Sequence, residues 1–337
     1  MDVRVRAGGL QGYVALMDEL GADPRPLLRR HGLGLAQLAD EDAQLPLAAV
    51  LDLMEDSARL TGCDDFGLRL ARRQDISQLG PVALAMQNCP SVADALDCLA
   101  RYLFVQSPGI AMSLHRPGQP GAGTIDLRYH ITAPGRQFPR QAYDQGMAVA
   151  HHMLGLLAGS RYRLLAVSLP FRPEASLQAH ARCFGARIHA DRPYCALHVD
   201  AACLDAPVRA ANPALLRVAT AYLTAHFPGP QQRVAPRVRL ALSHALVDAS
   251  TDKAAIAAAL AMHPRTLQRR LEAEGTSFDA IREELRHRHV LHYLSGTRLP
   301  LAQVAALLGF SEQSALTRYC RRRFGRTPSA IRAGADG

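Results

Sequence analysis

Apolar residues recur at helical spacing up to about residue 75, and a glycine stands where each stretch stops. Glycine readily takes the left-handed backbone conformation that ends a helix, as expected for Gly21, Gly32 and Gly62. The pattern therefore predicts an N-terminal series of helices at residues 13–20, 26–31 and 47–60.

The next part of the chain mixes two periods. Segments in which apolar and polar residues alternate flank the turn-rich residues 116–121, and they predict a hairpin of strands at 110–115 and 124–131. Further strands are expected at 164–169, 186–190 and 196–199, and helices at 92–102, 140–157 and 176–184. Ser91 and Asp94 form a capping-box-like start for the first of these helices. These elements predict an α+β domain.

Residues 213–227 predict one more amphipathic helix, with an apolar stripe wider than a surface helix needs. The stripe consists of Leu215, Leu216, Val218, Ala219, Tyr222 and Leu223. It fits core packing, a bridge between domains or a seam between two copies, and we favour the core or the bridge. The prolines and glycine at 228–230 then break the pattern. We place a linker at 229–232, between a domain at 1–228 and a second at 233–332, with a tail at 333–337.

The last third of the chain carries one short helical pattern twice. Ile256 and Val304 begin the two copies, 48 residues apart (304−256), whereas Leu267 and Leu316 in the following helices are 49 apart (316−267). One residue has been added in the turn, and both helical phases survive. The repetition predicts two helix-turn-helix units in an all-α domain, joined by a long helix.

Positive charge is concentrated in the repeat region. The 337-residue chain has a net charge of +9, and residues 231–337 hold 17 Lys+Arg against 9 Asp+Glu, or +8. Nearly all of these cations are arginine, whose planar fork matches phosphate oxygens and guanine edges. A high-GC genome would favour arginine too. The charge nevertheless suits a domain that binds double-stranded DNA.

The remaining composition indicates an intracellular protein. The seven cysteines are scattered, with no CxxC pair and no metal-ligand spacing, so we expect reduced and mostly buried thiols. The first twenty residues carry charges and lack the apolar core of a signal peptide, and no apolar run is long enough to span a membrane. We expect a cytoplasmic protein with no metal and no cofactor.

A helix-turn-helix presents the outward face of its second helix to the DNA major groove. Leucines of this helix face the small core, and the polar residues between them face outward. Pro264 suits the first position of the first such helix, Gly309 allows the second turn, and Ser311 is expected to cap the helix that follows. The residues predicted to read bases are Arg265, Gln268, Arg269, Gln313, Ser314, Thr317 and Arg318.

Other polar residues of the same helices are expected to hold the DNA backbone. The predicted phosphate contacts are Thr266, Arg270, Arg321 and Arg322, although a charge run such as 321–323 is as often only solvated. Thr276 with Asp279 is expected to cap the long helix between the copies. That helix would hold the two units so that they reach successive major grooves about 34 Å apart.

The repeat region resembles the AraC/XylS family of bacterial transcription regulators. The resemblance rests on the stretches 265–275, 307–314 and 325–329 and spans about residues 235–332. The N-terminal part, at 61–68, 77–80 and 184–185, is similar to the effector-binding domain of the subgroup that senses ornithine, arginine and related metabolites.

Several residues depart from the family pattern. The family usually has serine at the position of His263, glycine at that of Ala261, phenylalanine at that of Cys320 and an aromatic residue near Arg323. A non-glycine residue in a left-handed turn costs on the order of 1 kcal/mol, so Ala261 strains the first turn. Cys320 implies a looser second core, partly filled by Phe324 and the stem of Arg323.

The resemblance implies a regulator that usually activates transcription by touching RNA polymerase beside a promoter. It also implies an N-terminal domain that binds a small effector and self-associates, giving a homodimer. Polar residues near the predicted sheet and long helix are the effector-binding candidates, and each fits a surface or core role equally well: Arg128, His130, Arg140, Tyr143 and His151.

Two other classes of protein remain as alternatives. A ligand-independent architectural DNA-binding protein would not need a near-neutral N-terminal domain of this size. An enzyme would need a catalytic motif, and the sequence has no GxSxG, HExxH, P-loop or GxGxxG. A DNA-repair alkyltransferase would need a cysteine between proline and histidine, whereas Cys89 lies between Asn88 and Pro90. We therefore expect no catalytic residue.

Overall fold

The computed structural model describes residues 3–115, 123–131, 139–173, 176–192, 194–227, 234–235, 238, 241–242, 252–260, 262–297 and 299–333. The chain divides into two compact units, Met1–Phe227 and Pro228–Gly337. Each unit has its own hydrophobic core or cores. The predicted turn at 116–121 and the predicted linker at 229–232 lie outside the described residues.

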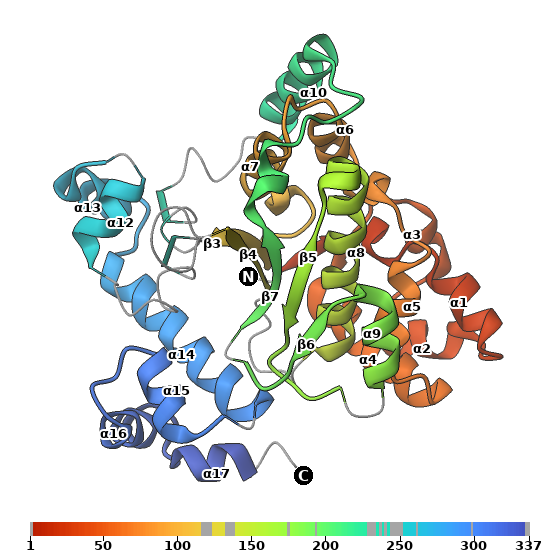
Figure 1. Cartoon of the computed structure of the whole chain (residues 1–337). Helices are drawn as coiled ribbons and strands as arrows, with labels where there is room; N and C mark the ends of the chain where they lie inside the picture. Colours follow the sequence, from red (N-terminus) through yellow and green to blue (C-terminus); the bar gives the residue numbers. More distant parts are fainter. Residues whose placement is uncertain are drawn as a thin grey trace. The chain divides into compact units, whose positions relative to one another are not determined.

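The N-terminal unit is an α+β structure, as predicted, with helices gathered on one face of a sheet (Figure 1). Its helices are α1 (Tyr13–Glu19), α2 (Pro24–Arg30), α3 (Leu35–Ala39), α4 (Leu47–Thr61), α5 (Phe66–Ala71), α6 (Pro81–Gln87), α7 (Val92–Tyr102), α8 (Arg140–Ala158), α9 (Leu177–Phe184) and α10 (Pro213–His226). Its strands are β1 (Arg4–Arg6), β2 (Gln44–Pro46), β3 (Ile110–His115), β4 (Thr124–Ile131), β5 (Leu164–Ser168), β6 (Arg187–His189) and β7 (Cys195–Asp200).

Most N-terminal elements lie where the sequence predicted them. Gly21, Gly32 and Gly62 follow α1, α2 and α4 with positive φ angles, and the Ser91 hydroxyl accepts a hydrogen bond from the Asp94 amide at the start of α7. The purely helical interpretation of the first 75 residues was wrong at one point. β1 and β2 form a small antiparallel sheet, in which Val5 and Leu45 pair across the strands and both enter the core.

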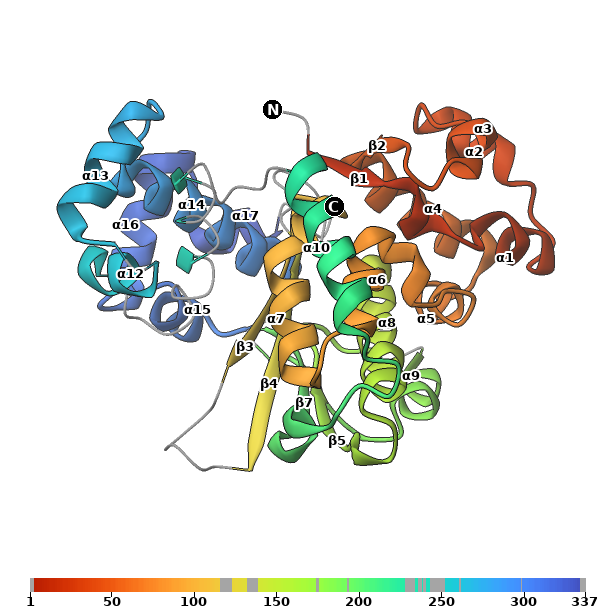
Figure 2. The same cartoon turned by 90° about the horizontal axis from the view of Figure 1, so that it is seen from above.

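The main sheet has five strands in the order β3-β4-β7-β5-β6. β3, β4, β7 and β5 pair antiparallel in turn, and β6 pairs parallel to β5 at the edge. Alternate residues such as Leu127 and Leu197 point into the core. α7 and α8 lie on that side of the sheet (Figure 2). The opposite face carries the polar residues of the same strands.

Two helices approach each other closely at Gly67. The Gly67 amide of α5 donates a hydrogen bond of 2.8 Å to the side-chain oxygen of Gln141 in α8. A Cβ atom at position 67 would lie only 2.0 Å from the Gln141 carbonyl oxygen. Glycine is therefore required for the contact between α5 and α8.

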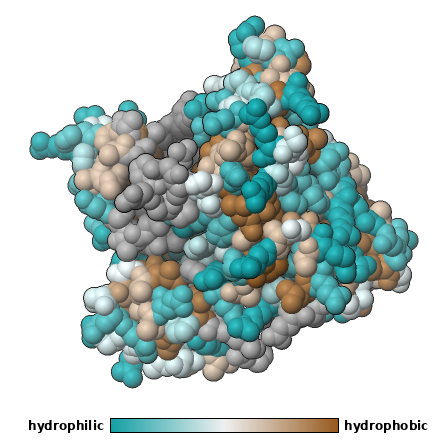
Figure 3. All heavy atoms as spheres, in the orientation of Figure 1, coloured by the Kyte–Doolittle hydropathy of each residue, from teal (hydrophilic) through white to brown (hydrophobic). Residues whose placement is uncertain are grey.

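α10 confirms the predicted helix but only part of its predicted packing. Ala219 and Leu223 are buried in the N-terminal core. The core interpretation was wrong for Leu215, Val218 and Tyr222, which are 45%, 64% and 45% exposed because they lie on the side of α10 away from that core. Apolar atoms reach the surface at the top of Figure 3, where α10 lies in Figure 1.

The C-terminal unit is helical, as predicted. Its elements are α12 (Lys253–Ala259), α13 (Pro264–Ala273), α14 (Phe278–Gly296), α15 (Leu301–Leu307), α16 (Gln313–Phe324) and α17 (Pro328–Ala333). Phe278, Ile281 and Leu285 of α14 pack into the core of the first helix pair. Val290, Tyr293 and Leu294 pack into the core of the second. α14 is thus the long helix that joins the two helix pairs of the C-terminal unit.

The cap predicted for α14 was wrong by one residue. Ser277, and not Thr276, precedes the helix, and its hydroxyl accepts a hydrogen bond from the Ala280 amide at 3.1 Å. The Thr276 amide is already bonded to the carbonyl of Leu271, which closes the end of α13. Thr276 therefore belongs to the end of one helix, and Ser277 begins the next.

All seven cysteines are free thiols, and five of them are buried. Burial raises the pKa of Cys320, inside the second C-terminal core, to about 11. Among the described residues, no helix is long and apolar enough to cross a membrane.

Candidate nucleic-acid interface and ligand cavity

The two helix pairs turn through the same hydrogen bond. In the first pair the Met262 amide donates to the Ala257 carbonyl at 2.8 Å, and in the second the Phe310 amide donates to the Ala305 carbonyl at 2.9 Å. Both members of this bond are offset by 48 residues (310−262 and 305−257). Gly309 has a φ angle of +69°, as its predicted place in the turn requires. The corresponding residue Ala261 lies outside the described residues.

The caps of the two outward helices locate the added residue. His263 caps α13, with its Nδ1 accepting a hydrogen bond from the Arg265 amide at 3.3 Å, and Pro264 takes the first position, as predicted. Glu312 stands at the equivalent place before α16, 49 residues on (312−263). The predicted Ser311 cap was therefore wrong. Ser311 is the residue inserted between the turn and the cap.

The predicted base-reading residues share one environment. Six of them are exposed, and Thr317 is half-buried. Leu267, Leu271 and Leu316, which alternate with them, are fully buried. Each outward helix therefore presents a polar face while its leucines fix it to the core. The residues on this face are Arg265, Gln268, Arg269, Gln313, Ser314, Thr317 and Arg318.

Hydrogen bonds orient part of this face. Arg318 donates to the Ser314 hydroxyl at 3.1 Å, and its other terminal nitrogen lies 3.6 Å from a carboxylate oxygen of Glu312. The amide of Gln268 donates to Glu272 at 2.9 Å and accepts from Lys253 at 2.5 Å. These surface contacts are worth little energy, so a nucleic acid can replace them.

The predicted phosphate-binding residues also lie on the outward helices. Arg270, Arg321 and Arg322 are exposed, and Thr266 is half-buried. Arg321 and Arg322 lie in the last turn of α16, beyond the residues that begin the helix. Arg323 is exposed as well, and Phe324 makes the predicted contribution to the core around Cys320.

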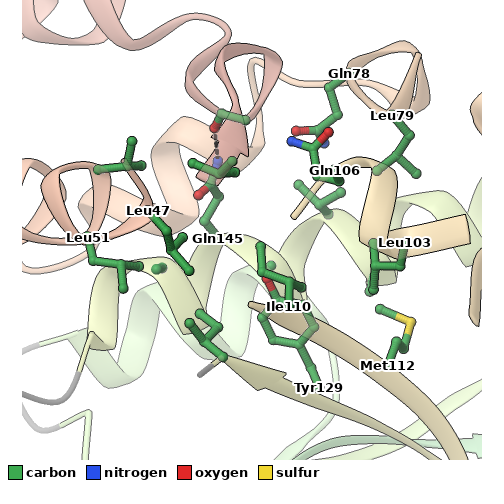
Figure 4. A pocket seen from close by; sticks show the side chains of 18 of the residues that line it. Leu47, Leu51, Gln78, Leu79, Leu103, Gln106, Ile110, Met112, Tyr129 and Gln145 are labelled. Carbon is green, nitrogen blue, oxygen red and sulfur yellow. Dashed lines mark hydrogen bonds between the residues drawn. The ribbon is translucent and has the colours of Figure 1, made fainter. Parts of the chain in front are cut away.

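The N-terminal unit contains a cavity of about 100 Å³ between α8, α4 and the strands β3 and β4 (Figure 4). Its wall is mainly aliphatic, with Leu47 and Leu51 from α4, Ile110 and Met112 from β3, and Met153 from α8. Gly146 of α8 leaves room for the Tyr129 ring, since a Cβ there would lie 2.4 Å from ring atoms. An engineered apolar cavity of about 150 Å³ holds benzene, and this smaller space is of the order that a small organic molecule occupies.

Glutamines form the polar part of the cavity wall. Gln145 donates to the Gly9 carbonyl at 2.6 Å and to Gln74 at 2.9 Å. Gln78 and Gln106 point toward one another in Figure 4. Gln78 is 5% exposed, and its buried side-chain nitrogen has no hydrogen-bond partner in the described part of the chain.

The predicted effector-binding residues lie elsewhere and are not brought together. None of the five lines the cavity. Arg128 and His130 project from β4 on the outer face of the sheet, where the Arg128 guanidinium lies 4.3 Å from the ring centroid of Tyr194. Tyr143 accepts a hydrogen bond from the Ile131 amide at 3.2 Å. Arg140 is the first residue of α8, and His151 lies in the second half of the same helix.

Two of these residues have packing roles on α8. Arg140 lies beside the fully buried pair Asp144 and His180, whose atoms are 2.8 Å apart. His151 Nδ1 is 2.8 Å from the Tyr162 hydroxyl, and burial lowers the His151 pKa to about 4.

Sequence reasoning missed the cavity glutamines. Gln145 alone gave a signal, as a polar residue on the same helical face as Ala142 and Val149. Gln78 and Leu79 lie within the stretch 77–80, already noted for its resemblance, but nothing in their spacing pointed to a cavity.

A hydrogen-bonded chain on the outer sheet face resembles a hydrolase triad. Ser168 Oγ lies 2.7 Å from His198 Nε2, and His198 Nδ1 lies 2.6 Å from Asp126. Ser168 is only 2% exposed, in a strand paired on both sides. Its neighbouring backbone amides belong to the sheet ladder and cannot form an oxyanion hole. The arrangement therefore satisfies the buried Asp126 and offers no site for acyl transfer.

Comparisons with known proteins cover both units. Residues 21–208 match the arabinose-binding N-terminal domain of the AraC transcription regulator, and residues 256–334 match a helix-turn-helix domain. The chain is 38% identical to the HTH-type transcriptional regulator VirS of Mycobacterium tuberculosis, over 98% of this chain and 96% of that protein. It is 27% identical to the ornithine utilization regulator of Pseudomonas aeruginosa, over 96% and 94%. The crystal structure of the regulator CdpR from Pseudomonas aeruginosa is 21% identical, covers 94% of this chain and 98% of its own, and gives a TM-score of 0.44.

Proposed function

Because this chain belongs to the AraC family of DNA-binding transcription regulators, we propose that α13 and α16 enter successive major grooves of promoter DNA under the control of a small effector. The observation that carries this proposal is the equivalence of the two helix pairs. Each turn is closed by an equivalent backbone hydrogen bond. Arg269 and Arg318 occupy matching exposed positions, 49 residues apart (318−269).

The length of α14 supports simultaneous binding by both helix pairs. Its 19 residues span about 28 Å at 1.5 Å per residue. This is close to the roughly 34 Å between successive major grooves on one side of DNA. Arg265, Gln268 and Arg269 read one groove; Gln313, Ser314, Thr317 and Arg318 read the next. Thr266, Arg270, Arg321 and Arg322 hold the phosphates.

The N-terminal unit controls the output of the DNA-binding unit. A metabolite bound in the first unit favours the state in which the protein activates transcription beside RNA polymerase, because an effector acts through a difference in affinity between two states. The cavity supports this role. Binding to promoter DNA places the protein in the cytoplasm.

DNA binding by the full chain tests the proposal. We expect affinity for duplex DNA to fall steeply with salt, because several phosphates exchange counterions for arginines. Arg269→Ala should weaken binding to the specific site, whereas Arg29→Ala, an exposed arginine of α2, should not. Affinity that is independent of salt, or equal effects of the two substitutions, contradicts the assignment.

Self-association runs through the exposed stripe of α10. Leu215, Val218 and Tyr222 lie on one side of the helix and are nearly half exposed or more. Covering this stripe with the same stripe of a second copy removes apolar surface from water. Val218→Glu should convert a dimer of the full chain into a monomer in light scattering, and Leu156→Glu, at an exposed leucine of α8, should leave it dimeric. A wild-type monomer contradicts this role for α10.

A further inference from the structure

Resting on the proposed effector control, we infer that the effector of this protein is an uncharged, mainly apolar small molecule that presents one hydrogen-bond-accepting oxygen to Gln78. A cyclic or short-chain ketone, ester or lactone has this chemistry. The inference concerns the cavity between α4, α8, β3 and β4, and three observations support it.

The wall of the cavity excludes a charged ligand. Among the described residues that line it, none carries a charge, and most are aliphatic. An ammonium group needs a carboxylate partner to offset its lost hydration when it is buried. The cavity offers none, so ornithine and similar cationic amino acids do not fit it.

The cavity wall contains a hydrogen-bond donor that lacks an acceptor. Gln78 is more than nine-tenths buried, and its side-chain nitrogen is a donor without a partner among the described residues. A buried donor without a hydrogen bond costs about 1–3 kcal/mol of folding free energy. A ligand oxygen that accepts a hydrogen bond from this nitrogen would remove that penalty. The Gln145 amide is already bonded to Gly9 and Gln74. Gln78 is therefore the group that orients the ligand.

A cation that contacts the cavity glutamines is already neutralised. Arg6 donates to the backbone carbonyl of Gln78 at 3.2 Å and to the side-chain oxygen of Gln106 at 3.5 Å. Its guanidinium is paired with Asp42 at 2.5 Å. A ligand carboxylate would thus bring a net negative charge into an apolar space, and a neutral oxygen would not. This favours a ketone or ester over the corresponding acid.

Probes of similar size distinguish these chemistries. Thermal unfolding of the full chain is followed with cyclohexanone, methylcyclohexane, cyclohexanecarboxylate and ornithine, since a ligand of the folded state raises the melting temperature. We expect saturable stabilisation in the order cyclohexanone, then methylcyclohexane, with none from the two charged probes. Cyclohexanone should bind about tenfold tighter than methylcyclohexane, the effect of one hydrogen bond.

Variants assign the binding to the cavity. Gln78→Leu should abolish the advantage of cyclohexanone over methylcyclohexane, and Gln178→Leu, on the exposed side of α9, should keep it. Ala150→Leu places a larger side chain in the cavity wall and should weaken both cyclic probes about tenfold or more.

Other outcomes overturn the inference. These are the absence of saturable binding by either uncharged probe, tighter binding of ornithine or of the carboxylate, or a cyclohexanone preference that survives Gln78→Leu. Salt-dependent DNA binding by the same preparation does not involve the cavity. If DNA binding persists while no uncharged probe binds, the ligand class is wrong and the proposed regulator stands. If DNA binding is absent, the proposed function itself fails.

Discussion

Glu55 is a half-buried carboxyl group of α4 in the N-terminal unit. Its carboxylate accepts a hydrogen bond of 2.7 Å from the Gln141 amide at the start of α8. Burial raises the pKa of Glu55 to about 7, and Asp144 adds to the rise, whereas the Gln141 hydrogen bond, Arg140 and Arg59 oppose it. The folded state therefore holds this proton more tightly than the unfolded state does.

The raised pKa makes stability depend on pH in a defined direction. Both states are protonated below about pH 4, and the free energy of unfolding falls as pH rises from there to about 7, where the folded group ionises. The Glu55→Gln variant has no group that ionises there, so this fall in stability with pH is absent. Its side-chain oxygen still accepts a hydrogen bond from the Gln141 amide. The variant should exceed the wild type by up to about 3 kcal/mol above pH 7, measured by urea unfolding.

Glu41→Gln provides the matched control for this prediction, because Glu41 is exposed. It should follow the wild type across the same pH range. If Glu55→Gln raises the free energy of unfolding equally at pH 4 and pH 8, the ionisation of Glu55 is not the cause of the gain.

Single residues also mark the limits of sequence prediction. Pro264 and Ser91 could be placed because each has a strong preference for one position of a helix start. Thr276 could not, since the neighbouring Ser277 has similar capping ability and takes the place. Ser311 could not, since Glu312 stands before α16 without a side-chain cap. Such choices depend on hydrogen bonds to the preceding turn, which the sequence does not display.

At the scale of elements, the contact between α5 and α8 is the most demanding in the N-terminal unit. Gly67→Ala would bring its methyl group to 2.0 Å from a backbone oxygen of α8, and neither helix can yield without breaking core packing. We expect the free energy of unfolding to fall by about 3 kcal/mol. Chemical denaturation of the full chain, followed for the N-terminal transition, measures the loss.

Gly155→Ala serves as the control for a helical glycine. A Cβ atom there would make an ordinary contact of 3.7 Å with Tyr162. Alanine is favoured over glycine within helices by roughly 1 kcal/mol, so this variant should be as stable as the wild type or more so. Equal losses for both variants would mean that the close approach of α5 and α8 does not govern the effect.

Elements with a strong period could be predicted, and the cavity between them could not. The hairpin of β3 and β4 and helices α7 and α8 follow from alternation and helical spacing. β1 and β2 are too short for a period, and they escaped prediction. The cavity is formed by residues as distant as Val5 and Met153. No local pattern places them side by side.

At the scale of the whole molecule, the repeat and the charge distribution identified the DNA-binding unit in advance. The two copies of the helix-turn-helix pattern predicted two similar hydrophobic cores. The structure has these two cores on the two halves of α14. The near-neutral N-terminal unit carried no such signature. Its predicted effector residues were chosen for polarity near a sheet and a helix, whereas the cavity is lined mainly by apolar side chains.

The separation of base reading from backbone contact is the prediction that concerns the whole regulator. Arg318 lies on the exposed face of α16, held by Ser314 near the start of the helix, and Arg322 lies one turn further on. Arg318→Ala should cost roughly 1–3 kcal/mol on the specific site and relax preference at one or two base pairs, as loss of a bidentate guanine contact does. Arg322→Ala should weaken specific and random DNA alike.

Salt dependence separates the two roles, because a phosphate contact releases counterions whatever the sequence. The slope of log affinity against log salt should flatten by about one unit for Arg322→Ala. Binding of both full-chain variants to specific and scrambled duplexes at several salt concentrations measures this. If Arg318→Ala loses equal affinity on both duplexes, Arg318 contacts a phosphate, and α16 does not enter the groove as proposed. If it loses affinity only on the specific duplex, the neighbouring Glu312 must release its contact with Arg318 when the base is read.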